Sequence, residues 1–473
     1  MRKPELLAPA GDPEKLIMAV RYGADAVYLG GEEFGLRAAA GNFSMAEMGR
    51  GIEYAHRHGA RVYVTVNIFA HNRHLPGLPA YLKEIASLGA DGILVSDPGI
   101  FSIARETVPQ LPVHISTQAN TSNWAAVEFW AQLGAKRIVL ARELSLAEIR
   151  EIKDRVDIEL ETFVHGAMCM SYSGRCLMSS YMTGRSANLG ECAQPCRWKY
   201  ALVEEKRPGQ YYPIEEDENG SYIFNSMDLC MIEHIPELVR AGIDSLKIEG
   251  RMKSVHYVAT VVSVYRKAID SFISSPETYR FDPEWMEEIR KVSHREYTTG
   301  FFFGRDNFRG ENVETSKYRR DYDFVGIVRD YLPDKGLAVI EQRNRFSVED
   351  LLEITGPDTP QFIQKVTRMT DGEGNPIDTA PHPQQTVIMP VDNPVKPLDM
   401  LRREKTKNNL IKIRIDPKYI FFLDNVIEGY DGLAIVSTGN PKTGEVTVYV
   451  TPDTYDDVMG ILENLPWPVQ IAK

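Results

Sequence analysis

Long apolar runs are missing from this sequence. No stretch approaches the ~20 consecutive apolar residues that a membrane-spanning helix needs. The first segment, MRKPELLAPAGDPEK, reaches a proline, a glycine and several charges before any apolar run could form a signal-peptide core. We therefore expect no membrane association and a cytoplasmic location.

Cysteine is also scarce, with five residues in 473. In the cytoplasm thiols stay reduced, so clustered cysteines more often bind metal or react than form disulfides. The sequence contains neither the HExxH motif of zinc proteases nor the GxSxG elbow of α/β-hydrolases. Because these motifs are absent, the cysteines are the main candidates for catalytic or metal-binding residues.

The sequence also lacks an excess of positive charge. It contains 54 Lys and Arg and 66 Asp and Glu, which gives a net charge of -12. This balance argues against broad, non-specific affinity for nucleic acids, although a local basic patch is compatible with it. The apolar share of 43% and charged share of 25% are typical of a globular protein. The length predicts two or three domains.

One phrase recurs through the first half of the chain, as in GADAVYL and GADGILV. Each copy follows an amphipathic run, so its glycine is predicted to cap a helix and its apolar residues to form a buried strand. The copies lie at 23–29, 59–64, 89–95, 134–140 and 242–248.

Eight buried strands are predicted when the strands without this phrase are added. They are 6–9, 26–29, 62–67, 92–96, 113–118, 137–141, 158–165 and 245–249. Parallel strands that alternate with helices predict a TIM-type (β/α)8 barrel over residues 1–320. An open, doubly wound sheet is the alternative.

Alternation along the strands predicts which side chains point into the barrel. In IELETFVH the inward set would be Glu159, Glu161, Phe163 and His165. The eighth strand would contribute Ser245, Lys247 and Glu249, and strands three and five end in Asn67 and Gln118. A polar C-terminal mouth follows, which is where barrel enzymes keep their chemistry.

The connection after strand seven, residues 165–245, carries all five cysteines. Its last part, from residue 227 to 242, is predicted to form the seventh helix, with Asp228 as N-cap and Cys230 in the first turn. Beyond the barrel, alternating short strands predict a small β-barrel or sandwich at 321–400. A basic linker at 401–414 and a small α/β domain at 415–473 complete the chain.

Three kinds of site could use these cysteines. A structural zinc site is one, although only Cys192 and Cys196 have the close spacing that zinc modules favour. A cysteine protease is the second, with His165 as the base for Cys169. The third is an iron-sulfur cluster held by widely spaced thiolates at the barrel mouth.

The segment ETFVHGAMCMSYSGRCLMS, residues 161–179, resembles the defining motif of peptidase family U-32, the collagenase-like proteases, at every specified position. LLAPAG, ADAVYLGG, STQAN, IEGRMK and YTTGFFFG also resemble that family. The resemblance covers roughly residues 1–400. The tail after about 415 resembles a small domain of unknown function that is sometimes fused to family members.

The resemblance implies more than proteolysis, because several family members are oxygen-independent hydroxylation proteins with a 4Fe-4S cluster. They include proteins that make 5-hydroxyuridine at the tRNA wobble position and require prephenate, a ribosomal-RNA cytidine hydroxylation protein, and a ubiquinone-biosynthesis pair. The chain most resembles the tRNA group. Carried over residue by residue, the implied cluster ligands are Cys169, Cys176, Cys192 and Cys230, and Cys196 could replace Cys192 or Cys230.

Other candidate residues follow from position and chemistry. His165 and Glu161 are candidates for proton transfer or substrate orientation, with a structural histidine as the alternative. A dicarboxylate such as prephenate needs fixed cations, and Arg142, Arg251 and Lys253 lie just beyond strands six and eight. Asn67 and Gln118 would add polar contacts to the substrate.

Contact with tRNA is implied by the family and weakly supported by three basic segments, at 317–320, 342–346 and 402–414. For the last of these, a solvated basic helix that links two domains is the favoured interpretation. The sequence therefore favours an RNA-hydroxylating iron-sulfur enzyme. A peptidase with a structural metal site, or a scaffold for a paired family member, are the competing predictions.

Overall fold

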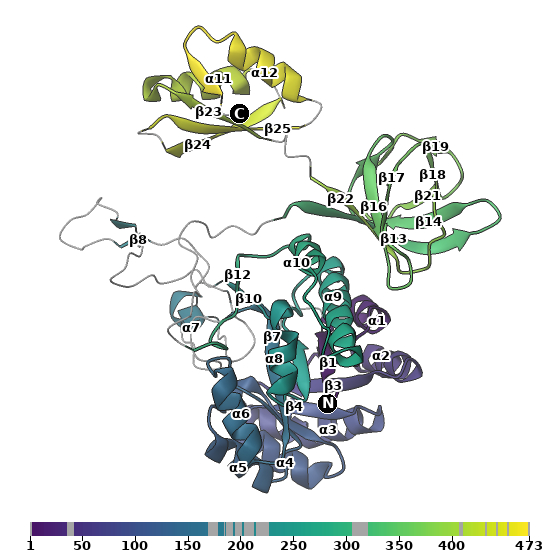
Figure 1. Cartoon of the computed structure of the whole chain (residues 1–473), viewed down its shortest axis with the longest axis vertical. Helices are drawn as coiled ribbons and strands as arrows, with labels where there is room; N and C mark the ends of the chain where they lie inside the picture. Colours follow the sequence, from purple (N-terminus) through teal and green to yellow (C-terminus); the bar gives the residue numbers. More distant parts are fainter. Residues whose placement is uncertain are drawn as a thin grey trace. The chain divides into compact units, whose positions relative to one another are not determined.

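A computed structural model of the chain is shown in Figure 1. It describes residues 2–35, 42–168, 178–183, 185, 193, 201–202, 212–213, 227–304, 320–405, 410–430, 433–440, 443–451 and 454–471. The chain divides into two compact units, Met1–Arg403 and Glu404–Lys473, which are described separately below.

A closed barrel of eight parallel strands forms the first part of the larger unit. The strands are β1 (Glu5–Pro9), β2 (Ala26–Gly30), β3 (Arg61–Val66), β4 (Gly92–Val95), β5 (Val113–Ile115), β6 (Arg137–Val139), β7 (Glu159–Ala167) and β11 (Ser245–Ile248). They are hydrogen-bonded in chain order, and pairing of β11 with both β7 and β1 closes the ring. The predicted TIM barrel is therefore confirmed, and the open sheet is excluded.

Helices cover the outside of the barrel, as the purple-to-teal ribbons of Figure 1 show. They are α1 (Pro13–Arg21), α2 (Met45–Arg57), α3 (Leu78–Ser87), α4 (Pro98–Thr107), α5 (Trp124–Gln132), α6 (Leu146–Arg155), α8 (Ile235–Arg240) and α9 (Val255–Ser274). Side-chain caps begin most of them, including full capping boxes at Ser44 of α2 and Ser145 of α6.

The glycine and the aspartate of the recurring phrase each have a structural role. The five phrase glycines, which follow helices as predicted, adopt positive φ angles: Gly23, Gly59, Gly89, Gly134 and Gly242. In three copies the next aspartate accepts a hydrogen bond from the backbone N–H of a neighbouring strand. These pairs are Asp25 with Leu6, Asp91 with Val62, and Asp244 with Leu160, at 2.7 to 2.9 Å.

Two additional strands extend the sheet at the end of β7. The strand β10 (Asp228–Cys230) is antiparallel to β7 and parallel to β12 (Tyr297–Thr298). The prediction that Asp228 caps the seventh helix with Cys230 in its first turn is therefore wrong. Helix α8 begins only after a 3-10 turn at Ile232–His234, because Asp228–Cys230 pairs with the long end of β7.

An antiparallel sheet domain follows α10 (Pro283–Arg290) within the same unit. Its strands are β13 (Tyr322–Leu332), β14 (Leu337–Gln342), β16 (Leu351–Thr355), β17 (Phe362–Lys365), β18 (Met369–Asp371), β19 (Pro376–Ile377), β21 (Thr386–Pro390) and β22 (Met400–Glu404). A separate pair, β15 (Phe346–Ser347) and β20 (Thr379–Ala380), accompanies this sheet. The short antiparallel strands over residues 320–405 agree with the predicted small β domain, and their order in the sheet is β17-β16-β22-β13-β14-β21-β18-β19.

The predicted basic linker is not a linker along most of its length. Met400–Glu404 is strand β22, and residues from 410 onward form β23 (Leu410–Ile415) of the smaller unit. Arg402 is fully buried, and its guanidinium donates to Glu353 Oε1 at 2.6 Å and pairs with Glu288 of α10 at 2.6 Å. These contacts join the sheet domain to the barrel and remove Arg402 from the predicted RNA-binding surface.

The smaller unit has the element order strand, helix, strand, strand, helix, strand. After β23 come α11 (Ile420–Glu428), β24 (Ala434–Asn440), β25 (Glu445–Val450), α12 (Tyr455–Glu463) and β26 (Val469–Ile471). The sheet order is β24-β25-β23-β26, and every pairing is antiparallel. This is the ferredoxin-like arrangement.

Among the helices in the described part of the chain, none is both long enough and apolar enough to cross a membrane.

Candidate functional site at the barrel mouth

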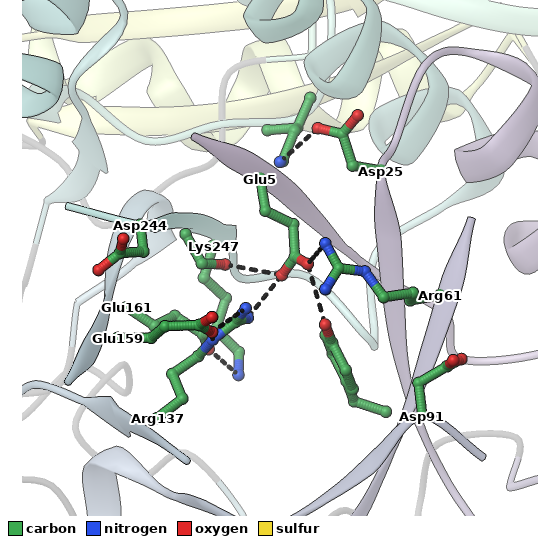
Figure 2. Close-up of polar contacts among 12 residues, drawn as sticks. Glu5, Asp25, Arg61, Asp91, Arg137, Glu159, Glu161, Asp244 and Lys247 are labelled. Carbon is green, nitrogen blue, oxygen red and sulfur yellow. Dashed lines mark hydrogen bonds and ion pairs between the residues drawn. The ribbon is translucent and has the colours of Figure 1, made fainter. Parts of the chain in front are cut away.

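A network of paired charges lies inside the barrel, near the N-terminal ends of its strands (Figure 2). Arg137 lies at its centre and is 2% exposed. Its guanidinium donates to Glu5 at 2.5 Å, to Glu159 at 2.8 Å and to Glu161 at 3.1 Å. The ammonium of Lys247 donates to the other oxygen of Glu161 at 2.8 Å. Every carboxylate in this network therefore faces a cation.

Glu161 points into the barrel, as predicted, but it lies in this network below the mouth. Burial alone would raise the pKa of the Glu161 carboxyl, but Lys247 and Arg137 outweigh burial and lower the pKa to about 2. A carboxylate held between two cations is a poor proton acceptor at neutral pH. The contacts thus favour a structural role for Glu161 over the predicted role in proton transfer.

His165 lies elsewhere, because β7 contains a bulge at this point. In the pairing with β11, Lys247 faces Phe163 while Ile248 faces His165, so one extra residue of β7 is inserted between them. The His165 ring packs against Tyr257 and Tyr265 of α9 and Tyr297 of β12, at centroid distances of 5.9, 5.5 and 5.5 Å. The prediction that it shares the inward face of Glu161 is wrong.

The chemistry of His165 follows from this environment. The ring is 1% exposed, and burial lowers its pKa to about 3, so the imidazole is neutral at physiological pH. The Tyr265 hydroxyl lies 3.4 Å from Nδ1, and Nε2 has no hydrogen-bond partner among the described residues. His165 is therefore a neutral ring with one nitrogen available to accept or donate.

Cys230 is the one predicted ligand within the described residues. It is opposite His165 in the β10–β7 ladder, and its side chain is 6% exposed. Burial raises the pKa of its thiol to about 12, so without a metal the sulfur stays protonated. Cys169, Cys176 and Cys192, with the alternative Cys196, lie outside the described residues. In the sequence, Cys169 follows the end of β7 by two residues.

Cys230 borders a cavity of about 520 Å³. The cavity is lined by residues of β10, the 3-10 turn, α10 and the segment before β12: Met227, Cys230, Glu233, His234, Met286, Arg290, His294, Glu296, Tyr297, Thr298 and Thr299. His294 stacks on Tyr297 with ring centroids 4.8 Å apart, and Tyr297 in turn contacts His165. A thiol, a neutral imidazole and a set of polar side chains therefore meet at one edge of the mouth.

The predicted substrate-binding residues come together in part. Asn67 Nδ2 donates to Gln118 Oε1 at 2.6 Å, although β5 ends at Ile115 and Gln118 belongs to a 3-10 turn at Thr117–Ala119. Arg142 donates to the Ala167 carbonyl at 2.6 Å, at the end of β7, and its guanidinium lies 3.9 Å from the centroid of the Phe163 ring. These three residues therefore line the mouth.

Arg251 lies against Gly30 at the C-terminal end of β2, and Lys253 lies beside Tyr257 of α9. Arg251 is 4% exposed and donates to Asn42 Oδ1 at 2.8 Å. The Lys253 ammonium donates to the Ser293 carbonyl at 3.2 Å and lies 5.1 Å from the centroid of the Tyr257 ring. Of the three predicted cations, Arg142 has the most direct connection to the end of β7.

Sequence reasoning missed Tyr265 and His294. Tyr265 lies eight residues after Tyr257 on α9, and a tyrosine at helical spacing is indistinguishable from a core residue in the sequence. Its hydroxyl donates to the Val164 carbonyl at 2.8 Å, which ties α9 to the bulge in β7. His294 stands only three residues before the YTTG motif, and that proximity was the available signal.

The fold and the site together define a TIM-barrel protein in which the connection after the seventh strand carries all the cysteines and returns Cys230 to the barrel mouth. The model of Peptidase family U32 matches residues 11–312, and that of the Peptidase family U32 C-terminal domain matches 320–402. This chain belongs to peptidase family U32, which confirms the predicted resemblance. A third model, Domain of unknown function (DUF4911), matches 413–469.

Several curated relatives have names that state an activity, including the following three. The tRNA hydroxylation protein P1 of Bacillus subtilis is 46% identical over 404 residues, covering 85% of this chain and 96% of the relative. The tRNA hydroxylation protein P of Escherichia coli is 40% identical, covering 83% of this chain and 94% of the relative. The 23S rRNA 5-hydroxycytidine C2501 synthase of Escherichia coli is 34% identical, covering 72% of this chain and 53% of the relative.

Proposed function

We propose that this protein is an RNA-modifying enzyme that hydroxylates tRNA wobble uridine to 5-hydroxyuridine without molecular oxygen. One observation carries the proposal: the two relatives named tRNA hydroxylation proteins align with 85% and 83% of this chain, across both the barrel and the sheet domain. Hydroxylation of ribosomal RNA cytidine is the second candidate, because the 5-hydroxycytidine synthase aligns with 72% of the chain.

The proposed cofactor is a 4Fe-4S cluster held by Cys169, Cys176, Cys192 and Cys230. Cys230 fits this role because its thiol is buried at the end of a strand and borders a cavity, where a soft thiolate ligand is shielded from water. When bound, the cluster would supply electrons or bind an oxygen donor. Binding also requires the loss of the Cys230 proton, which the high pKa of the free thiol opposes until a metal is present.

The neutral His165 ring is placed to serve this site. Because Cys230 and His165 are ladder partners, the imidazole belongs to the same edge of the barrel as the thiol. Three tyrosine rings fix its orientation. We assign His165 a role in orienting the substrate or in moving a proton at Nε2.

An anionic co-substrate, prephenate, is proposed to enter through the mouth beside Arg142. The Arg142 side chain is 10% exposed, its guanidinium lies over the Phe163 ring, and its Nη2 is 3.9 Å from Glu249 Oε2. A planar guanidinium recognises a carboxylate through two parallel hydrogen bonds. Asn67 and Gln118, which are bonded to each other, provide neutral donors and acceptors near the same face of the barrel.

The function is tested by expressing this chain in an Escherichia coli strain that lacks both its 40% identical relative and the 34% identical 5-hydroxycytidine synthase. Digested tRNA is analysed by mass spectrometry for 5-hydroxyuridine and its derivatives, and ribosomal RNA is analysed for 5-hydroxycytidine. We expect the wild-type chain to increase the tRNA product. An increase in the ribosomal product alone would replace the tRNA assignment, and no increase in either would contradict the proposal.

The peptidase alternative is tested with the same purified protein. Proteolysis of casein or gelatin by the wild-type chain that disappears in a Cys169→Ala variant with its metal content unchanged would support a peptidase. We expect no such activity.

A further inference from the structure

The smaller unit exposes one whole face of its sheet. The strand residues Ile411, Ile413, Val446 and Val448 are buried and pack in one core with Leu423 of α11 and Val458 of α12. Both helices therefore cover the same face, which the upper part of Figure 1 also shows. The alternate residues of the strands form the opposite face, here called the open face.

The open face is organised in rows across the strands. The first row is Ile435, Tyr449 and Leu410, which are paired directly in the β24–β25–β23 ladders and are 71%, 41% and 40% exposed. The second row is Ser437, Thr447 and Lys412. The third row contains Glu445, Arg414 and Gln470.

Charge is divided between the two faces of this unit. Lys412 and Arg414 are exposed on the open face, where Glu445 is the acidic residue beside them. The helices on the other face carry the acidic side chains Asp424, Glu428, Asp457 and Glu463. The unit is therefore polarised, and the open face is its more basic side, in a protein with an overall net charge of -12.

We infer that the open face binds single-stranded RNA, with a base stacked on Tyr449 and phosphates contacted by Lys412 and Arg414. A four-stranded antiparallel sheet that presents aromatic and basic side chains is a general solution for unpaired RNA, because the ring stacks on a base while the cations follow the backbone. The hydroxyls of Ser437 and Thr447 lie in the same row as Lys412, next to the row of the ring, where they can bond base edges or 2′-hydroxyls.

The choice of an RNA partner over a protein rests on this row order. The apolar row is only one residue deep along the strands, and the next two rows are polar or charged. A stable protein interface buries on the order of 800 Å² of surface per partner, more than a row of three apolar side chains provides. A single aromatic ring flanked by aliphatic side chains instead matches the size of one or two stacked bases.

The inference that the bound RNA is a tRNA loop rests on the proposed function, whereas binding of unpaired RNA as such does not. The test uses the full purified chain and fluorescence anisotropy with a labelled oligouridine of about 12 nucleotides. We expect Tyr449→Ala to weaken binding about tenfold, and Tyr449→Phe to retain most of the affinity because the ring remains. Tyr430→Ala is the matched control, since Tyr430 is 52% exposed but lies beyond the end of α11.

The salt dependence tests the cations. In Lys412→Ala the slope of log affinity against log salt should fall by about 0.7, the value for one phosphate contact with a single strand. Unchanged affinity of Tyr449→Ala, or equal losses in Tyr449→Ala and Tyr430→Ala, would overturn the inference. Dissociation of a wild-type dimer by Tyr449→Ala, with RNA affinity unchanged, would also overturn it and would assign the open face to a second copy of the chain.

Failure of this inference can be distinguished from failure of the proposed function. If the function is wrong, oligouridine binding still depends on Tyr449 while no hydroxylated nucleoside is formed. If the inference is wrong, the hydroxylated nucleoside is formed while binding is insensitive to Tyr449.

Discussion

The two ends of the barrel interior use polar side chains in opposite ways. At the N-terminal end, Arg137 and Lys247 pair with the buried carboxylates of Glu5 and Glu161 and with the half-buried carboxylate of Glu159, so the charges satisfy one another. At the C-terminal end, Cys230 and His165 are buried and neutral, and a cavity adjoins the thiol. The comparison separates a part that stabilises the fold from a part that can act on a ligand.

The largest effect is expected from a substitution at the C-terminal end of the barrel, where Cys230 lies. Cys230→Ser should abolish formation of the hydroxylated nucleoside and reduce the iron content, because a ligand is lost, while the fold is retained. Iron analysis and circular dichroism of the variant check both points. Cys196→Ser is the control and should keep its iron; the opposite pattern would make Cys196 the ligand in place of Cys230.

Breaking the structural end should act on stability. Arg137→Met leaves the carboxylates of Glu5, Glu159 and Glu161 without their shared cation, which should reduce the free energy of unfolding by about 3–5 kcal/mol. Urea denaturation measures the change. Arg61→Ala removes an exposed partner of Glu5 and should cost less than about 1 kcal/mol. Similar losses in both variants would contradict the central position of Arg137.

The charged network also makes the stability of the protein depend on pH, through the carboxyl of Glu161. The pKa of Glu161 is lowered from 4.5 to about 2 in the folded protein. Its contribution, ~3 kcal/mol, is therefore present above the unfolded pKa and is lost as the pH falls from about 4.5 toward 2. Urea denaturation in this range should show a shallower acid loss for Glu161→Gln than for the wild type. Parallel curves would exclude this contribution.

A smaller effect is expected from His114, which is buried beside the charged network and packs against Tyr63 with ring centroids 4.6 Å apart. Burial and the nearby Arg137 lower the pKa of His114 from 6.5 to about 3. The folded state therefore binds fewer protons than the unfolded state, and stability falls as the pH decreases below 6.5. At pH 5 His114→Phe should avoid a loss of ~2 kcal/mol. An equal loss of stability in both proteins between pH 7 and pH 5 would refute this assignment.

Much of the barrel could be predicted from the sequence, because its strands and helices repeat a short local pattern. The glycine after each helix and the apolar run that follows report a helix end and a buried strand without any knowledge of distant residues. The polar mouth could be predicted at Asn67, Gln118 and Arg142, because strand ends carry their side chains to one face.

What could not be predicted depends on pairing between distant segments. The bulge that turns His165 toward Tyr257 and Tyr265 arises where β7 is joined by β11 on one side and β10 on the other. The segment Asp228–Cys230 has the sequence of a helix start. It forms a strand because it pairs with the end of β7, which extends beyond the barrel. Likewise, the positive charge of Arg402 predicted that its side chain would be exposed to solvent. The side chain is buried instead, because Glu353 and Glu288 neutralise its charge.

We propose that Cys230 and the cysteines before it hold a redox-active cluster at the barrel mouth. Anaerobic purification of the wild-type chain, followed by iron and acid-labile sulfide analysis and a visible spectrum, tests this claim most directly. A brown protein with about four irons and four sulfides per chain is the predicted result. A colourless protein with one zinc and no sulfide would contradict it.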